Sequence, residues 1–185
     1  MKSHVQSLVA LLGSQALLLP IRTGTKKPSG KWKHLTLDHM SDRKHLAKLD
    51  RAANIGVALG DVSSGLCSID IDDDALVEPF LEMNPFLKDT LCSKGARGCN
   101  FWVRITSEYK RTFHFNANGL RVGEFRSTGS YTVIHGKHPE GMDYCLIRET
   151  KPIEIPFQSI KWFEETTHTH PPRGFAPLLA ARKSN

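Results

Sequence analysis

The chain has 185 residues, 39% of them hydrophobic and 24% charged, which excludes a wholly disordered protein and suffices for one domain with a buried core. Its net charge of +6 favours an anionic partner such as nucleic acid only slightly. No stretch is long enough to cross a membrane, so no membrane partner is expected. The cysteines form no CxxC pair, which argues against zinc and favours reduced thiols in a cytoplasmic protein; they are Cys67, Cys92, Cys99 and Cys145.

Helices and strands are mixed along the first half of the chain. In order, we expect a helix at 3–13, a strand at 16–21, a basic loop at 22–32, a helix at 41–49, and strands at 55–59 and 66–72. Ser41 is the expected cap of the second helix. A third helix, with Asp73 or Asp74 as its cap, is predicted to run to Met83, before Pro85.

The second half of the chain is rich in strands. We expect strands at 99–105, 120–126, 130–135 and 144–147 and a last helix at 159–165. Ser127-Thr128-Gly129 has the composition of a hairpin turn, so residues 120–135 are predicted to form an antiparallel pair. This mixture with hairpins favours an α+β fold over a doubly wound parallel sheet. Residues 166–185 are expected to be a tail or the start of a linker.

Two carboxylates on one strand carry the clearest functional signal. In the segment 66–72 apolar and polar residues alternate, so Asp70 and Asp72 share one face with Leu66 and Ser68. Such a pair needs a counter-charge when buried, and a hard divalent cation is the usual one. An EF-hand is excluded, because Ala75 stands at its glycine position and Leu81 at its final glutamate position.

Glu124 is a candidate third acid on a separate strand. A carboxylate there would complete a site for phosphoryl transfer with one or two metal ions. On spacing alone, however, a surface residue paired with Arg121 or Arg126 is the favoured explanation of Glu124.

Two basic loops could supply contacts to phosphates. The segment 93–98 combines Lys94 and Arg97 with two glycines before an aromatic strand, although it lacks the GK[ST] of a P-loop. Lys137 and His138 lie in a Gly/Pro loop that follows another strand. Each of these segments, taken alone, is also compatible with an ordinary solvated turn.

In this order, the motifs resemble the primase-polymerase (prim-pol) domain of the archaeo-eukaryotic primase superfamily, found in plasmid and phage replication proteins. The resemblance covers about residues 5–150 and rests on Lys26-Lys27-Pro28 with Trp32, Asn54-Ile55-Gly56-Val57, the Asp70/Asp72 pair, Arg97-Gly98-Cys99-Asn100-Phe101-Trp102, Gly123-Glu124-Phe125-Arg126 and His138-Pro139-Glu140-Gly141. Asn100 stands where the family has a histidine that contacts nucleotide phosphates. It can donate a hydrogen bond but carries no charge.

The resemblance implies a catalytic core with a mixed or antiparallel sheet flanked by helices, occupying residues 1–165. It implies a DNA primase/polymerase that uses Mg²⁺ or Mn²⁺ held by Asp70, Asp72 and Glu124, single-stranded DNA, and dNTP or NTP. Nucleotide-binding residues would be Lys94, Arg97, Asn100, Arg126, Lys137 and His138, and DNA-binding residues Lys26, Lys27, Lys31 and Trp32. A helicase domain, in the same or a neighbouring protein, is the implied partner.

Two alternatives stay open from the sequence. A metal-dependent nuclease also places paired acids on a strand, but it usually needs further downstream carboxylates. A non-catalytic DNA-binding module of a replication protein is compatible with the asparagine at position 100.

Overall fold

The N-terminal helix shows how local sequence sets the elements. In the computed structural model, which describes residues 3–165, α1 (His4–Leu12) begins at Ser3, whose hydroxyl accepts from the Gln6 N–H while the Gln6 side chain accepts from the Ser3 N–H. This reciprocal pair is a capping box. Val5, Leu8 and Leu12 form the buried stripe of the helix. The predicted helix at 3–13 is confirmed, and its buried face follows the apolar spacing of residues 5, 8, 9 and 12 in the sequence.

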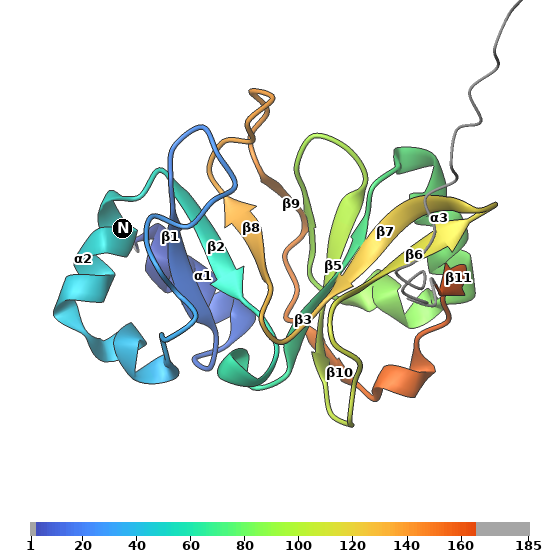
Figure 1. Cartoon of the computed structure of the whole chain (residues 1–185), viewed down its shortest axis with the longest axis horizontal. Coiled ribbons are helices and arrows are strands. Elements are labelled where there is room, and N and C mark those ends of the chain that lie inside the picture. Colours follow the sequence, from blue (N-terminus) through green and yellow to red (C-terminus); the bar gives the residue numbers. More distant parts are fainter. Residues whose placement is uncertain (1–2, 166–185) are drawn as a thin grey trace, which may run out of the picture.

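The described residues form a mixed α+β fold with three α-helices and two sheets (Figure 1). The other helices are α2 (Arg43–Arg51) and α3 (Asp74–Met83). The strands are β1 (Leu17–Ile21), β2 (Asn54–Ala58), β3 (Leu66–Ile71), β4 (Cys92–Lys94), β5 (Cys99–Ile105), β6 (Phe113–Ala117), β7 (Leu120–Arg126), β8 (Tyr131–His135), β9 (Cys145–Arg148), β10 (Ile153–Ile155) and β11 (Glu164–Glu165). The predicted α+β class is confirmed.

The small sheet has the order β1-β2-β8 and is antiparallel throughout. In Figure 1 it lies with α1 and α2 on one side of the molecule. Leu18, Ile55 and Val57 face these helices in one buried cluster, which also takes in Leu66 and Trp102 of the large sheet. The helices therefore also tie the two sheets together.

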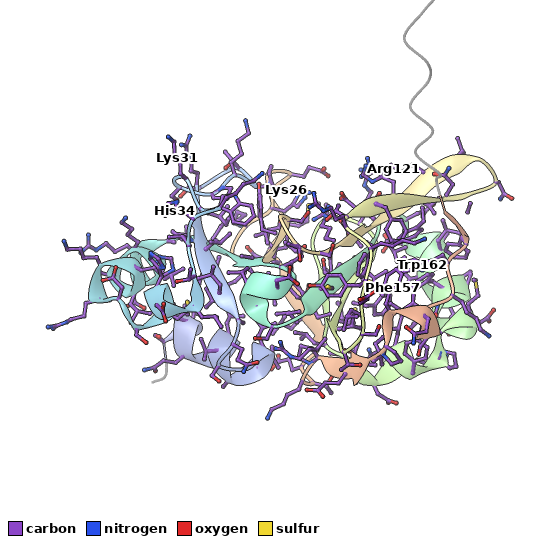
Figure 2. The ribbon with its side chains drawn as sticks, turned by 60° about the horizontal axis from the view of Figure 1, so that its bottom comes forward. Lys26, Lys31, His34, Arg121, Phe157 and Trp162 are labelled. Atoms are coloured by element: carbon purple, nitrogen blue, oxygen red, sulfur yellow. The ribbon has the colours of Figure 1, made fainter. Side chains whose placement is uncertain are left out.

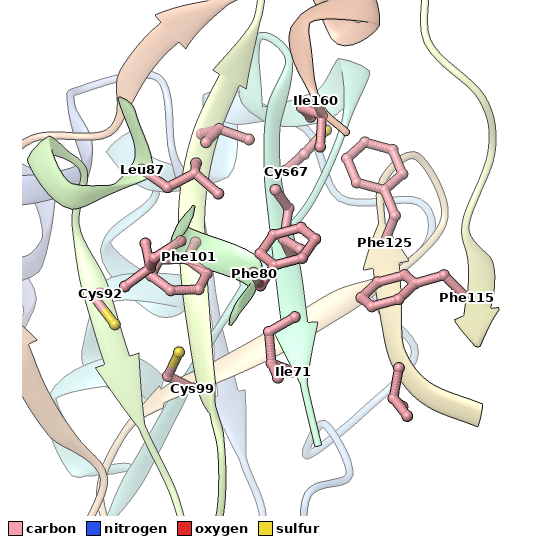
Figure 3. Close-up of a cluster of buried hydrophobic side chains, with 14 of the residues drawn as sticks. Cys67, Ile71, Phe80, Leu87, Cys92, Cys99, Phe101, Phe115, Phe125 and Ile160 are labelled. Atoms are coloured by element: carbon pink, nitrogen blue, oxygen red, sulfur yellow. The ribbon is translucent and has the colours of Figure 1, made fainter. Parts of the chain in front are cut away.

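The large sheet has the order β11-β6-β7-β3-β5-β4-β9, and β10 pairs with β5 in parallel. Its core is aromatic: Phe80 of α3 stacks on Phe115, with ring centroids 5.9 Å apart, and lies near Phe101 and Phe125 (Figure 3). Odd-numbered residues of β3 enter this core, and even-numbered ones face the other way. The predicted common face of Leu66, Ser68 and Asp70 is confirmed.

Several expected elements differ in the structure. The segment 120–135 is not a hairpin: β7 pairs with β3 and β6, whereas β8 pairs with β2 in the other sheet, so residues 127–130 carry the chain from one sheet to the other. Buried Ser127 fixes this crossing, because its hydroxyl donates to the Lys110 carbonyl and its N–H donates to the Thr112 hydroxyl. Local turn composition does not specify the sheet that a following strand joins.

One helix cap and the last predicted helix are also corrected. α2 is capped by Asp42 rather than Ser41. Of the two caps predicted for α3, Asp73 is the one that accepts from the Ala75 N–H. Residues 159–165 are not helical: a 3₁₀ turn spans Phe157–Ser159, and β11 follows. Trp162 packs into the aromatic core there instead, and its ring centroid lies 5.0 Å from that of Phe113. The predicted tail at 166–185 lies outside the described residues.

No helix among residues 3–165 is long and apolar enough to cross a bilayer. Cys67, Cys92 and Cys99 are buried as free thiols in strands of the large sheet, as small apolar side chains are. Burial raises the pKa of the Cys67 thiol well above its usual value. The Cys67 thiol therefore stays protonated in the core.

Candidate active site

Four polar side chains lie in one register row across neighbouring strands. Asp70 of β3 is opposite Asn100 of β5 on one side and Glu124 of β7 on the other, and Glu124 is opposite His114 of β6. Directly opposite residues point to the same face of a sheet and come within contact distance. Pairing of β3 with both flanking strands therefore brings residues 30 and 54 positions from Asp70 to its side.

Asp70, Asn100 and Glu124 of this row line a cleft of about 410 Å³ between the two sheets. The cleft is lined by Lys26, Asp70, Asp72, Ala96, Arg97, Asn100, Glu124, Arg126, Gly129, Ser130, Tyr131, Thr132, Val133, His138, Glu140 and Tyr144. Its floor is closed where the Ser68 hydroxyl of β3 lies 2.8 Å from the Thr132 hydroxyl of β8.

Asp70 is the most enclosed acid of the row. Its side chain is 14% exposed and that of Glu124 is 16% exposed. Burial raises the pKa of the Asp70 carboxyl, and the negative charges of Asp72 and Glu124 act in the same direction, whereas Arg126 opposes them. Ionised Asp70 therefore depends on a nearby positive charge.

Arg126 supplies that charge in the structure. Its Nη2 lies 2.7 Å from Oδ2 of Asp70, and its Nε donates to Oε2 of Glu124 at 2.8 Å. Arg121 lies 3.6 Å from the same glutamate oxygen. Glu124 thus lies beside Asp70 in the row and is paired with Arg126 and Arg121, although it is not a surface residue.

Two glycines allow the strands to approach closely enough. A Cβ at Gly123 would lie 2.3 Å from the carbonyl oxygen of Asp70, and a Cβ at Gly98 would lie 1.7 Å from that of Ile71. Gly98 also has a φ angle of +57°, which residues other than glycine rarely adopt. The glycines of both motifs therefore have a steric role beside the acids.

Basic side chains also line the cleft. They are Lys26 and Arg97, together with buried His138. Nδ1 of His138 accepts from the Glu140 N–H at 3.2 Å, so its neutral form carries the proton on Nε2. Burial, with the charges of Lys26 and Arg97, lowers the pKa of His138. His138 is therefore a neutral hydrogen-bond donor beside two permanent cations at neutral pH.

The structure brings together the following predicted site residues around the cleft: Asp70, Asp72, Glu124, Arg97, Asn100, Arg126 and His138. Lys26, predicted as a DNA contact, also lines it. No donor among the described residues reaches Oδ1 of Asn100, which is inaccessible to solvent. That oxygen is thus an unused acceptor beside Asp70.

Two predicted nucleotide contacts lie elsewhere. The Lys94 ammonium is 2.5 Å from Oδ1 of Asp74 and does not line the cleft. The Lys137 ammonium lies 3.4 Å from Oδ1 of Asp143, while the Lys137 backbone exchanges two hydrogen bonds with the buried side chain of Asn54. Both lysines therefore stabilise loops at the margin of the cleft.

The remaining predicted DNA contacts lie on the basic loop before the small sheet. Lys27 and Lys31 are exposed, and Figure 2 shows Lys26 between Lys31, on the side of the small sheet, and Arg121, on the side of the large one. Trp32 is half-buried and packs edge-on against Tyr131, with ring centroids 5.4 Å apart. Trp32 therefore anchors the loop rather than offering a free ring face.

The three carboxylates fit a divalent cation in ligand type and charge, because Mg²⁺ and Mn²⁺ prefer hard oxygen donors. The deep position of Asp70 also requires a counter-charge. In residues 3–165, however, no three His, Cys, Asp or Glu side chains are close enough to ligate one ion together, and Arg126 contacts two of the three carboxylates. The donor set is therefore present, with an arginine bound to it.

Sequence reasoning missed the residues that join the row to its surroundings. Nδ1 of His114 lies 3.8 Å from Oε1 of Glu124. Thr132 closes the floor. No local motif marks these residues, since their roles arise from pairing between distant strands.

The model of the bifunctional DNA primase/polymerase N-terminal domain family, Prim-Pol, matches residues 9–158. The chain belongs to this family. The match covers the last four residues of α1, all of α2 and α3, and all strands except β11. No curated protein matches the chain.

Family membership confirms the predicted resemblance and the fold. It supports a function of the DNA primase/polymerase type and an enzyme of the nucleotidyltransferase type for this Prim-Pol chain. The residues that line the cleft, acids and cations alike, lie within the matched residues.

Proposed function

We propose that this Prim-Pol domain is a metal-dependent nucleotidyltransferase that makes or extends primers on single-stranded DNA. The observation that carries the proposal is the register of β5, β3 and β7. It places Asp70 beside Glu124 in a cleft that is also lined by Lys26, Arg97 and His138. Acids and cations in one cleft suit a substrate that brings both a triphosphate and its metal.

In this proposal Asp70, Asp72 and Glu124 hold Mg²⁺ or Mn²⁺. When bound, such a cation would polarise the α-phosphate and lower the pKa of the attacking 3′-hydroxyl. The chain's own residues supply orientation: Asp70 and Glu124 are fixed by two strands each, so the acids are held without a mobile loop.

In this proposal the basic side chains that line the cleft bind the triphosphate. Lys26 and Arg97 provide charge, and Arg97 offers a planar fork suited to phosphate oxygens. His138 donates from Nε2, because its Nδ1 is already an acceptor for the Glu140 N–H. Asn100 adds an uncharged amide donor in place of the family's histidine.

Single-stranded template is assigned to the exposed face above the cleft. Lys27 and Lys31 are free of ion pairs with acids among the described residues and would contact the DNA backbone. A helicase domain remains the proposed partner in replication of a plasmid, phage or other mobile element.

A denaturing-gel assay tests this function. Wild-type chain is incubated with single-stranded template, labelled dNTP or NTP, and Mg²⁺ or Mn²⁺, with and without a primer. The same reactions use Asp70→Asn and Asp72→Asn, and Asp50→Asn as the control, because Asp50 is an exposed acid of α2 that is not among the residues lining the cleft. We expect metal-dependent products from the wild type and the control only.

Other results would replace the proposal with a named alternative. Shortening of labelled DNA without nucleotides would indicate a nuclease. Equal DNA binding by wild type and Asp70→Asn, with no product from either, would indicate a binding module. Products from the unprimed reaction separate priming from extension alone, and the two nucleotide sets separate deoxyribose from ribose preference.

A further inference from the structure

Arg126 connects the acidic row to the floor of the cleft. Its Nη2 lies 2.7 Å from Oδ2 of Asp70, its Nε lies 2.8 Å from Oε2 of Glu124, and its Nη1 lies 3.5 Å from the hydroxyl oxygen of Thr132. All three nitrogens of the guanidinium thus face protein oxygens, and 26% of the side chain is exposed. Nη1 and Nη2 each keep a second N–H, but the orientation of the guanidinium is set by the two carboxylates and Thr132.

The oxygens that Arg126 contacts belong to the two most enclosed acids of the proposed metal site. Two neighbouring carboxylates that are largely removed from water need a positive charge between them. Arg126 is the residue of its strand whose guanidinium reaches both, since Arg121 contacts Glu124 alone. A divalent cation would require the same carboxylates.

We propose that Arg126 is a positioning residue that holds Asp70 and Glu124 together in the metal-free protein, and that a divalent cation competes with it for these carboxylates. This inference rests on the assignment of Asp70 and Glu124 as metal ligands in the proposed function. It replaces the role of Arg126 as a phosphate contact, which the sequence suggested. Removing Arg126 therefore weakens the metal-free fold and strengthens cation binding.

The test uses the full chain with Arg126→Met and, as the matched control, Arg121→Met on the same strand. In EDTA we expect the Tm of Arg126→Met to fall by about 5 °C or more, since one partner of an enclosed pair is lost. In a titration followed by electron paramagnetic resonance of free Mn²⁺, we expect its Kd for Mn²⁺ to fall about tenfold, because a nearby like charge is removed. Arg121→Met should change the Kd less than about twofold, as its charge is more exposed.

Contrary results are equally clear. An unchanged Tm in EDTA, or Mn²⁺ binding by Arg126→Met that is unchanged or weaker, overturns the inference. If Arg126→Met does not fold without metal, Arg126→Lys is used, because an ammonium keeps the charge but cannot span both acids. It should show the same two shifts at smaller size, and their absence overturns the inference.

The measurements of Tm and of Kd for Mn²⁺ do not depend on DNA synthesis. The proposed function and the competition between Arg126 and the cation can therefore fail separately. If wild type binds Mn²⁺ through Asp70 but makes no product, the polymerase function fails and the competition stands. If Asp70→Asn binds Mn²⁺ as well as wild type does, the carboxylates are not ligands, and the inference is overturned.

Discussion

The hydroxyls of Ser68 and Thr132 lie 2.8 Å apart, and this contact joins the central strand of the large sheet to the edge strand of the small one. Both residues are almost completely buried. Ser68 precedes Asp70 on the same face of β3, and the Thr132 hydroxyl also accepts from Arg126. The separation of the sheets, and with it the width of the cleft, is thus set beside the acidic row.

This contact predicts a cost for removing either hydroxyl alone. Ser68→Ala or Thr132→Val should each lower the free energy of unfolding by about 1–3 kcal/mol, because a buried hydroxyl is left without its partner. The double variant should lose less than the sum of the two. Urea unfolding of the three variants measures this, and strict additivity would show that the hydroxyls act independently.

Gly123 predicts a steric limit beside the acids. Gly123→Ala would place a Cβ 2.3 Å from the Asp70 carbonyl oxygen, so β7 and β3 must separate. We expect a loss of about 2 kcal/mol or more in stability and a strong loss of synthesis. Gly30→Ala is the control, since nothing lies within 4 Å of its Cβ position. Equal melting temperatures for both variants would contradict the close packing.

Lys26, which lines the cleft with His138, and Lys137, the neighbour of His138 in the sequence, should differ in their effect on nucleotide binding. Lys26→Met should raise KM for the nucleotide about tenfold, because a charge-assisted contact in the cleft is lost. Lys137→Met should leave KM nearly unchanged, since its ammonium pairs with Asp143 outside the lining of the cleft. Steady-state kinetics at constant ionic strength compares them, and the reverse order would restore the role that sequence assigned to Lys137.

Buried histidines predict lower stability in mild acid. Burial lowers the pKa of His45, whose Nε2 lies 3.0 Å from the Leu18 carbonyl oxygen, and it also lowers the pKa values of His135 and His138. At a pH between the folded and unfolded pKa values, the unfolded chain binds more protons. Stability should therefore be complete above pH of about 6.5 and fall as the pH decreases through the folded values.

His45→Gln isolates one of these groups, because glutamine can still donate to the Leu18 carbonyl. Its Tm should depend less steeply on pH below about 6.5 than that of the wild type. His34→Gln, at an exposed position, serves as the control. Parallel curves of Tm against pH for wild type and His45→Gln would exclude His45 as a source of the acid sensitivity.

Predictions from the sequence worked where a local pattern had one physical solution. The alternation in 66–72 placed Asp70 on the polar face of β3, and the apolar stripe of 5, 8 and 12 gave the buried face of α1. They failed where a local signal had two solutions. Ser127-Thr128-Gly129 suits a hairpin and also a crossing between sheets, and only strand pairing distinguishes them.

The candidate site shows the same division. The sequence by itself determined the α+β class, the family and the acids, because alternation, turn residues and motif order are local properties of the chain. Tertiary structure alone decided that Asn100, Asp70, Glu124 and His114 form one row, that Arg126 binds two acids, and that Lys26 rather than Lys137 lines the cleft. The physical reason is that side-chain contacts across a sheet depend on strand order and register, which are fixed by packing of the whole chain.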